Sequence, residues 1–179
     1  GVTCADGWKS SRRQDPEFVL VAEFADVDTS RFAVQSALPG PSVLSPLQAT
    51  DALSALPRRL DMWIESFLVA SSVTAVLSQR LLRRVCDNCR ETYDPPPQEM
   101  AFLRALGGDV PEGGFMRGAG CNFCTQTGYL ERIGVYEMMA ITDGIRELIL
   151  DRASHDDVRK LDAPEGLHTL QEEAKRLVR

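Results

Sequence analysis

Two pairs of closely spaced cysteines are the residues of this sequence with the clearest capacity for chemistry. Each pair has CxxC spacing, and together they comprise Cys86, Cys89, Cys121 and Cys124. A CxxC turn directs two thiolates towards one ion, so two such turns can supply the four ligands of a tetrahedral zinc site. Because four protein ligands leave no position for a catalytic water, we expect this zinc to stabilise the fold. Two disulfides or four free thiols are the alternatives.

The rest of the sequence favours zinc over disulfides. It contains neither a recognisable secretory signal peptide nor a run of about 18 apolar residues that could cross a membrane. We therefore expect no direct membrane span and a reducing compartment, in which disulfides are rare.

Length and charge limit the remaining possibilities. The chain has 179 residues, of which 44% are hydrophobic and 26% are charged, so it can bury one ordinary core and a small metal-stabilised satellite. Its net charge of −6 argues against a general nucleic-acid-binding surface.

Glu23 is a second candidate for chemistry. It follows the apolar run from Phe18 to Ala22, which predicts a buried strand of a mainly parallel sheet. Open α/β sheets bind ligands at the carboxyl ends of their strands, and nucleotide hydrolases place a magnesium-linked or water-activating acid there. Asp26 and Asp28 are better explained as caps of the following helix.

The surrounding pattern predicts an α/β chain that ends in short helices. We expect a second strand over 42–47, a helix from Thr50 or Asp51 that Pro57 kinks or restarts, and a buried helix over 64–79. A short helix over 100–106 and one or two strands over 128–141 follow. Three final helices then begin at Thr142 or Asp143, at Ser154 and at Thr169. The last three helices are expected to form an appendix to the α/β domain.

Several of these segments resemble, in order and spacing, those of the type II secretion and type IV pilus assembly ATPases, a family of hexameric motors. The motor-like segments are residues 13–16, 21–26, 28–29, 33–38, 51–52, 60–62, 79–81 and 84–86. The tetracysteine site and residues 128–137 resemble the C-terminal zinc-binding module of the family.

The resemblance implies a division of the chain into three parts. Residues 1–85 correspond to a remnant of a RecA-like P-loop ATPase domain, 86–141 to a tetracysteine zinc-binding module, and 142–179 to a C-terminal helical segment. It implies structural Zn²⁺ and, for the family, ATP and Mg²⁺ as cofactors. It also implies self-association or binding to complete motor subunits, an inner-membrane platform protein as a partner, and a cytoplasmic location at that membrane.

The sequence departs from the family pattern at its nucleotide-handling positions. The Walker A loop, GxxxxGK[ST], is absent from these residues, and its family position would precede Gly1. Glu23 matches the catalytic glutamate of the family's atypical Walker B motif, where it would orient or activate the attacking water. Ala22 and Ala25 stand where the family has a glycine and an arginine.

The sequence also departs from the histidine box of the family. Pro41 and Gln48 occupy the two positions where the family usually has histidines. We therefore expect this chain alone to bind nucleotide weakly or not at all. Two functions remain open. One is a truncated or degenerate motor ATPase, and the other is a non-catalytic, zinc-stabilised module that docks on a motor or platform protein.

Overall fold

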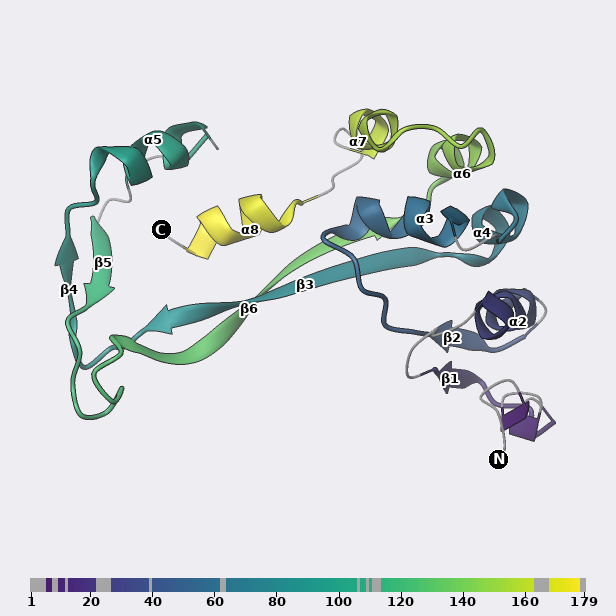
Figure 1. Ribbon diagram of the computed structural model, residues 1–179, viewed down its shortest axis with the longest axis horizontal. Helices are drawn as coiled ribbons and strands as arrows, with labels where there is room; N and C mark the ends of the chain where they lie inside the picture. The colour runs from purple at the N-terminus through teal and green to yellow at the C-terminus, as the bar shows by residue number, and fades with distance from the viewer. Residues whose placement is uncertain are drawn as a thin grey trace. The chain divides into compact units, whose positions relative to one another are not determined.

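The computed structural model describes residues 6–7, 10–11, 13–21, 27–38, 40–61, 64–105, 107–108, 110, 114–162 and 168–177. Segment 22–26, with the candidate Glu23, lies outside these ranges. The elements, labelled in Figure 1, are β1 (Phe18–Leu20), α2 (Val27–Ala37), β2 (Ser42–Leu44), α3 (Ala52–Asp61), α4 (Ser66–Ser72), β3 (Ala75–Val85), β4 (Arg90–Tyr93), α5 (Pro97–Ala105), β5 (Phe115–Gly118), β6 (Tyr129–Ala140), α6 (Asp143–Leu150), α7 (His155–Asp162) and α8 (Leu170–Leu177).

The chain divides into two compact units that interleave in the sequence. Unit 1 comprises residues 1–78 and 138–167, and unit 2 comprises 79–137 and 168–179. They interleave because β3 and β6 each contribute residues to both units. The three consecutive segments expected from the sequence, with boundaries after residues 85 and 141, remain a prediction about domains.

The first strand of unit 1 is partly as predicted. β1 pairs in parallel with β2, with Val19 opposite Val43, so the prediction of a parallel strand is confirmed. The prediction that the strand is buried is wrong, because Phe18 and Leu20 are 70% and 75% exposed. A continuous apolar run is typical of a strand covered on both faces. Within the described residues, however, β1 and β2 form a sheet of two strands only.

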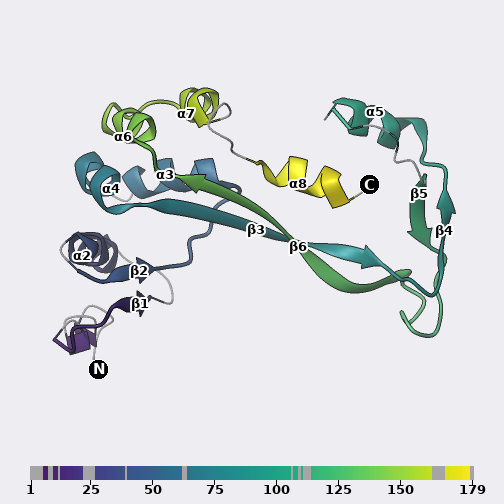
Figure 2. The same cartoon turned by 180° about the vertical axis from the view of Figure 1, so that it is seen from behind.

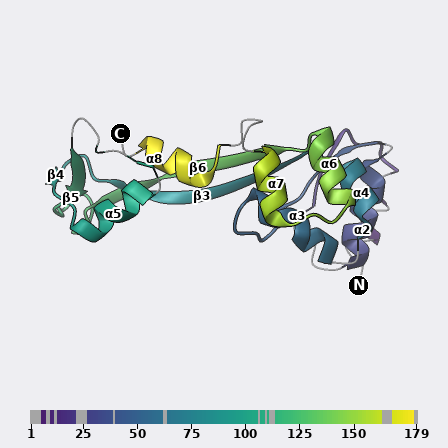
Figure 3. The ribbon, with the colours of Figure 1, turned by 90° about the horizontal axis from the view of Figure 1, so that it is seen from above.

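Unit 1 has an apolar core drawn from both of its sequence segments. Its members are Ala52, Leu53, Leu56, Ile64, Leu68, Val69, Ala70, Met139, Ile141, Ile145, Ile149 and Val158. Ile145 and Ile149 lie one turn apart on α6 and face this core, as expected for an amphipathic helix. α6 packs on α4 and α7 packs on α3 (Figure 2), an arrangement that Figure 3 shows from above. Although α6 and α7 were expected in a C-terminal appendix, they supply core residues of unit 1.

The predicted buried helix over 64–79 is wrong in its second half. α4 ends at Ser72, and β3 begins at Ala75. The hydroxyls of Ser71 and Ser72 donate to carbonyls of the preceding turn, and Val73 is already extended, with φ −79° and ψ 126°. β-branched residues favour an extended backbone here. A run that is apolar on most faces fits a buried helix and a strand equally well, so periodicity could not separate them.

α3 is a single helix despite the proline within it. Asp51 and Ser54 form reciprocal capping bonds, in which the Ser54 N–H donates to the Asp51 carboxylate at 2.7 Å and the Asp51 N–H donates to the Ser54 hydroxyl at 3.1 Å. The predicted start of this helix is therefore confirmed. The helix continues through Pro57 to Asp61, so a restart at the proline is wrong, and the alternative, a kink there, stays a prediction. Burial of Leu53 and Leu56 in the core of unit 1 offsets the hydrogen bond that the proline removes.

The three predicted helix starts near the C-terminus are confirmed. The Thr142 hydroxyl accepts the N–H of Ile145 at the start of α6. At α7, Ser154 and Asp157 bond to each other, and the Asp157 N–H donates to the Ser154 hydroxyl at 3.3 Å. At α8, Thr169 is the capping residue, and α8 belongs to unit 2.

β3 and β6 pair with each other. The Ile141 N–H donates to the Thr74 carbonyl, and the Cys86 N–H donates to the Gly128 carbonyl, so the strands are antiparallel. β6 has 12 residues and β3 has 11, and Glu131 in β6 has φ 66°. An extra residue with positive φ is the signature of a β-bulge.

Unit 2 contains a hairpin that the sequence did not predict. β4 and β5 pair antiparallel, with Arg90 opposite Gly118 and Tyr93 opposite Phe115, and α5 lies in the connection between them. Residues 97–105 form this helix, close to the expected position. In the described part of the chain, no helix has the length and apolarity needed to cross a membrane.

Candidate metal centre

All four cysteines predicted as metal ligands lie in one cluster. Their Sγ atoms lie within 4.8 Å of one another, and none of the four forms a disulfide. The Cys86–Cys121 and Cys89–Cys124 Sγ distances are 3.8 Å, and the Cys121–Cys124 distance is 3.7 Å. Sulfurs about 2.3 Å from a central tetrahedral zinc would lie about 3.8 Å apart. The donor set therefore fits zinc in both chemistry and size.

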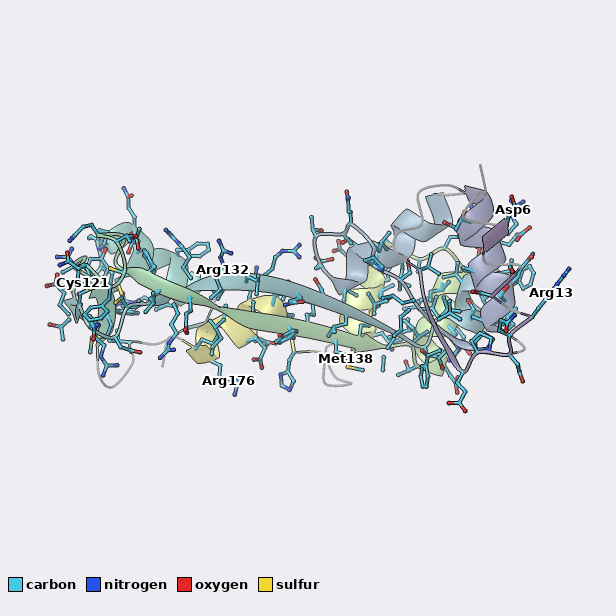
Figure 4. All side chains as sticks on the ribbon, turned by 90° about the horizontal axis from the view of Figure 1, so that it is seen from below. Asp6, Arg13, Cys121, Arg132, Met138 and Arg176 are labelled. Atoms are coloured by element: carbon cyan, nitrogen blue, oxygen red, sulfur yellow. The ribbon has the colours of Figure 1, made fainter. Side chains whose placement is uncertain are left out.

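The hairpin of unit 2 brings the two CxxC turns together. Cys86 follows β3 and Cys89 precedes β4, whereas Cys121 and Cys124 lie between β5 and β6. Pairing of β4 with β5 places the ends of these turns side by side, and the Ala119 N–H donates to the Cys89 carbonyl at 2.9 Å. In Figure 4, Cys121 marks the position of the cluster within unit 2. The excursion between the turns thus returns the second pair to the first.

The second CxxC turn has an unusual backbone. Thr125 and Gln126 both have positive φ, of 49° and 64°, although neither is a glycine. The Gln126 N–H donates to the Cys121 carbonyl at 2.9 Å, and the Thr127 N–H and hydroxyl donate to the Cys124 carbonyl at 3.1 and 2.6 Å. Non-glycine residues hold such conformations at a cost of about 1–3 kcal/mol each, and they cluster at functional sites. Here they curl the chain around the Cys124 sulfur.

Main-chain amides stabilise negative charge on Cys124. The N–H groups of Cys121 and Gly128 lie 3.2 and 3.3 Å from its Sγ. Desolvation opposes ionisation, but these two donors, with contacts from the Cys121 and Cys89 thiols, lower the pKa of Cys124 to about 6. Desolvation and the neighbouring thiols raise the pKa of Cys89 to about 12. A bound cation would remove this asymmetry, because all four ligands bind as thiolates.

Within its described residues, unit 2 buries few apolar side chains besides the cysteines of this cluster. Among its described residues, the buried apolar ones are Cys86, Cys124 and Val135. The ion pairs around the cluster, such as Arg84–Asp87 at 2.7 Å and Arg117–Glu91 at 2.9 Å, are largely exposed, and exposed pairs stabilise weakly. Small modules without an apolar core commonly rely on a metal. The arrangement is therefore suited to a structural ion.

The two positions that correspond to the histidine box of the family lie apart from this cluster in the sequence. Pro41 and Gln48 lie on either side of β2, in unit 1, and supply no imidazole. Glu23 is not among the described residues. Conversely, the sequence did not reveal that Gly118 packs against Gly128 beside the cysteine cluster, or that Gly128 donates to Cys124. Gly128 lies four residues after Cys124, but this spacing alone does not indicate either contact.

Comparison with known proteins agrees with the resemblance found in the sequence. Residues 1–179 match the family described as Type II/IV secretion system protein. The chain belongs to this family. The type II secretion system protein HxcR of Pseudomonas aeruginosa is 36% identical over 177 residues, covering 99% of this chain and 34% of HxcR. The type IV pilus assembly ATPase PilB of Thermus thermophilus is 32% identical over 173 residues, covering 97% of this chain and 20% of PilB.

Two solved ATPase structures share the fold of this chain. The ATPase DotB of Yersinia pseudotuberculosis has a TM-score of 0.62 and 17% identity, over 97% of this chain and 36% of DotB. The pilus retraction motor PilT, solved with bound ADP, has a TM-score of 0.55 and 18% identity, over 96% of this chain and 42% of PilT. The chain thus has the fold of the corresponding parts of DotB and PilT. The secretion-family sequence described here spans about a third, or less, of HxcR and PilB.

Proposed function

We propose that this chain is the zinc-stabilised part of a motor ATPase that drives type II secretion or type IV pilus assembly. The observation that carries the proposal is the four-sulfur cluster, with Sγ atoms within 4.8 Å, in a chain that matches the secretion family over residues 1–179. Cys86, Cys89, Cys121 and Cys124 would hold the ion. Zinc would supply a cross-link between the two CxxC turns and no open coordination position for chemistry.

The role of the proposed ion follows from the two CxxC turns and the strands that it would connect. The first turn continues β3, the second precedes β6, and β4 and β5 lie between the two turns. An ion bound by both turns fixes the base of the hairpin to the ends of both long strands. We propose that this makes unit 2 a rigid lever on the motor, one that needs no large apolar core.

Nucleotide hydrolysis is proposed for the larger protein of which such a sequence forms part. PilB is named as an ATPase, and PilT was solved with ADP. These 179 residues contain no GxxxxGK[ST] loop to bind the β- and γ-phosphates. ATP and Mg²⁺ would therefore require a phosphate loop from a further segment or subunit. Glu23 would contribute the acid that orients the attacking water.

Partners are proposed from the same relationship. Subunits of the motor would associate with one another as a hexamer on the cytoplasmic side of the inner membrane and act on a platform protein there. The alternative of a non-catalytic docking module gains no support from the comparisons, because the relatives PilB and DotB carry ATPase names.

Metal content tests the proposal directly. We expect the purified 179-residue chain, prepared without chelator, to contain about one zinc per chain, and Cys124→Ser to lose most of it because three ligands bind far more weakly. Cys4→Ser is the matched control, since Cys4 is the cysteine outside the two CxxC pairs. Elemental analysis beside native mass spectrometry measures both. Equal zinc in all three proteins would contradict the assignment of the ligands.

A further inference from the structure

Gly128 links the two CxxC turns of the cysteine cluster through its main chain. Its carbonyl accepts the N–H of Cys86 at 3.0 Å, at the start of the first CxxC turn. Its own N–H donates to the Sγ of Cys124 at 3.3 Å, in the second turn. Its φ of 76° is one that residues with a side chain rarely adopt. Gly128 thus contacts a candidate ligand from each CxxC pair.

Gly118 lies directly against Gly128. A Cβ added to Gly118 would overlap the carbonyl of Gly128, and a Cβ added to Gly128 would overlap the carbonyl of Gly118. Gly118 is also the last residue of β5 and pairs with Arg90, which follows Cys89. The two glycines therefore set the distance between β5 and the chain segment that enters β6.

We propose that the main-chain contact between Gly118 and Gly128 is the positioning element that determines how tightly the four cysteines bind zinc. This inference rests on the proposed zinc site and extends it to two residues that are not ligands. The four sulfurs reach tetrahedral spacing only when the two CxxC turns approach each other closely. Glycine at both positions is what permits that approach.

A methyl group added at Gly118 or Gly128 should destabilise the metal-bound state more than the metal-free state. Without metal, the loops can separate slightly and relieve the overlap. With metal, four short bonds from two turns forbid that separation, so the strain remains. Residues that orient metal ligands without binding the metal typically change affinity about 10- to 100-fold when they are replaced.

Three alanine variants distinguish the effect of the Gly118–Gly128 contact on zinc binding from the effect of backbone strain. Gly118→Ala adds the overlap, and Gly128→Ala adds the overlap together with strain at a positive φ. Gly114→Ala is the matched control, because Gly114 has φ 72° in the same unit and an added Cβ would meet nothing within 4 Å. Its strain is present with and without metal and therefore cancels in the binding equilibrium.

Competition of the full chain with a chromogenic zinc chelator measures the affinities. We expect zinc to bind about 10- to 100-fold more weakly to Gly118→Ala and Gly128→Ala than to the parent chain. Gly114→Ala is expected to stay within about twofold of the parent. Cobalt(II) titration gives a second readout, since distorted tetrathiolate geometry changes the intensity of the cobalt d–d absorption bands.

The outcomes distinguish failure of this inference from failure of the proposed function. A parent chain that binds no zinc overturns both. A parent that binds zinc, with Gly118→Ala and Gly128→Ala equally tight, overturns the inference and leaves the zinc site intact. Hydrogen exchange at Leu68–Ala70, in the core of unit 1, shows whether a variant is misfolded as a whole. Loss of protection there along with loss of metal would mean that the effect is not local, and would also overturn the inference.

Discussion

Thr169 and Glu172 show how single residues define the start of α8. The Glu172 carboxylate accepts the N–H of Thr169 at 2.9 Å, and the Thr169 hydroxyl accepts the N–H of Glu172 at 3.2 Å. This reciprocal arrangement is a capping box, and it satisfies two amide donors that the helix leaves unpaired. The hydrogen bond from the Thr169 N–H lowers the pKa of Glu172. The carboxylate is therefore a stabilising feature in its charged form.

We expect the start of α8 to loosen in acid. A carboxyl whose pKa is lowered by folding stabilises the folded state fully above its ordinary pKa of about 4.3, and this stabilisation is lost as the pH falls through the lower folded value. Hydrogen exchange at Leu170–Leu177 between neutral pH and pH 3, corrected for intrinsic rates, measures it. In Glu172→Gln the additional loosening in acid should be smaller. An unchanged pH response in that variant would contradict this role for Glu172.

Local residue patterns predicted helix starts well because caps act within a few residues. Thr142, Ser154 and Thr169 each begin a helix as expected. The clustering of Cys86, Cys89, Cys121 and Cys124 was also predictable, because CxxC spacing itself builds a turn that can direct two thiolates towards one ion. Neither prediction required knowledge of the distant packing.

The elements that were missed depend on neighbours that the sequence does not reveal. The chain leaves α4 at Ser72 and enters β3 because β6 is available as a pairing partner, which a pattern over 64–79 does not show. β4 is short and polar, and Arg90 and Glu91 are exposed. Its sequence therefore lacks the alternation of apolar and polar residues that predicts a half-buried strand. The contact between Gly118 and Gly128 likewise depends on the hairpin that β4 and β5 form.

The β-bulge in β6 gives a test at the level of this element. Glu131 has φ 66°, and a side chain in this conformation costs about 1 kcal/mol or more relative to glycine. We expect Glu131→Gly to leave stability unchanged or raise it by up to about 1 kcal/mol, less the small contribution of its exposed pair with Arg84.

Arg132→Gly is the matched control for the bulge. Arg132 is the next residue in β6, is exposed, and is not among the residues with positive φ. Glycine there should destabilise by about 0.5–1 kcal/mol, because it frees the unfolded backbone without relieving strain. Chemical denaturation of the two variants measures the difference. Equal destabilisation by both would argue against a strained bulge at Glu131.

At the scale of the whole molecule, the two units depend on different interactions. Unit 1 has a core of aliphatic residues, and burial of each Leu or Ile side chain there contributes about 1.5–3 kcal/mol. In unit 2, two of the three buried apolar residues within the described ranges are Cys86 and Cys124. Removal of a metal should therefore affect the two units differently.

We expect a strong chelator to raise hydrogen exchange in residues 86–93 and 115–129 and to leave Leu68–Ala70 protected. The first two ranges hold the CxxC turns and the hairpin, whereas the last lies in the core of unit 1. The Cys124→Ser variant should show the same pattern without chelator, and Cys4→Ser should resemble the parent. A uniform loss of protection along the chain would contradict this separation.

X-ray absorption spectroscopy at the zinc edge of the purified chain tests the central claim most directly. Four thiolates from Cys86, Cys89, Cys121 and Cys124 predict a single shell of four sulfurs at about 2.3 Å, without nitrogen or oxygen neighbours. This shell would identify the ion as structural and place both CxxC turns on it. A shell that contains oxygen or nitrogen ligands, or a metal-free chain whose mass shows two disulfides, would contradict the account.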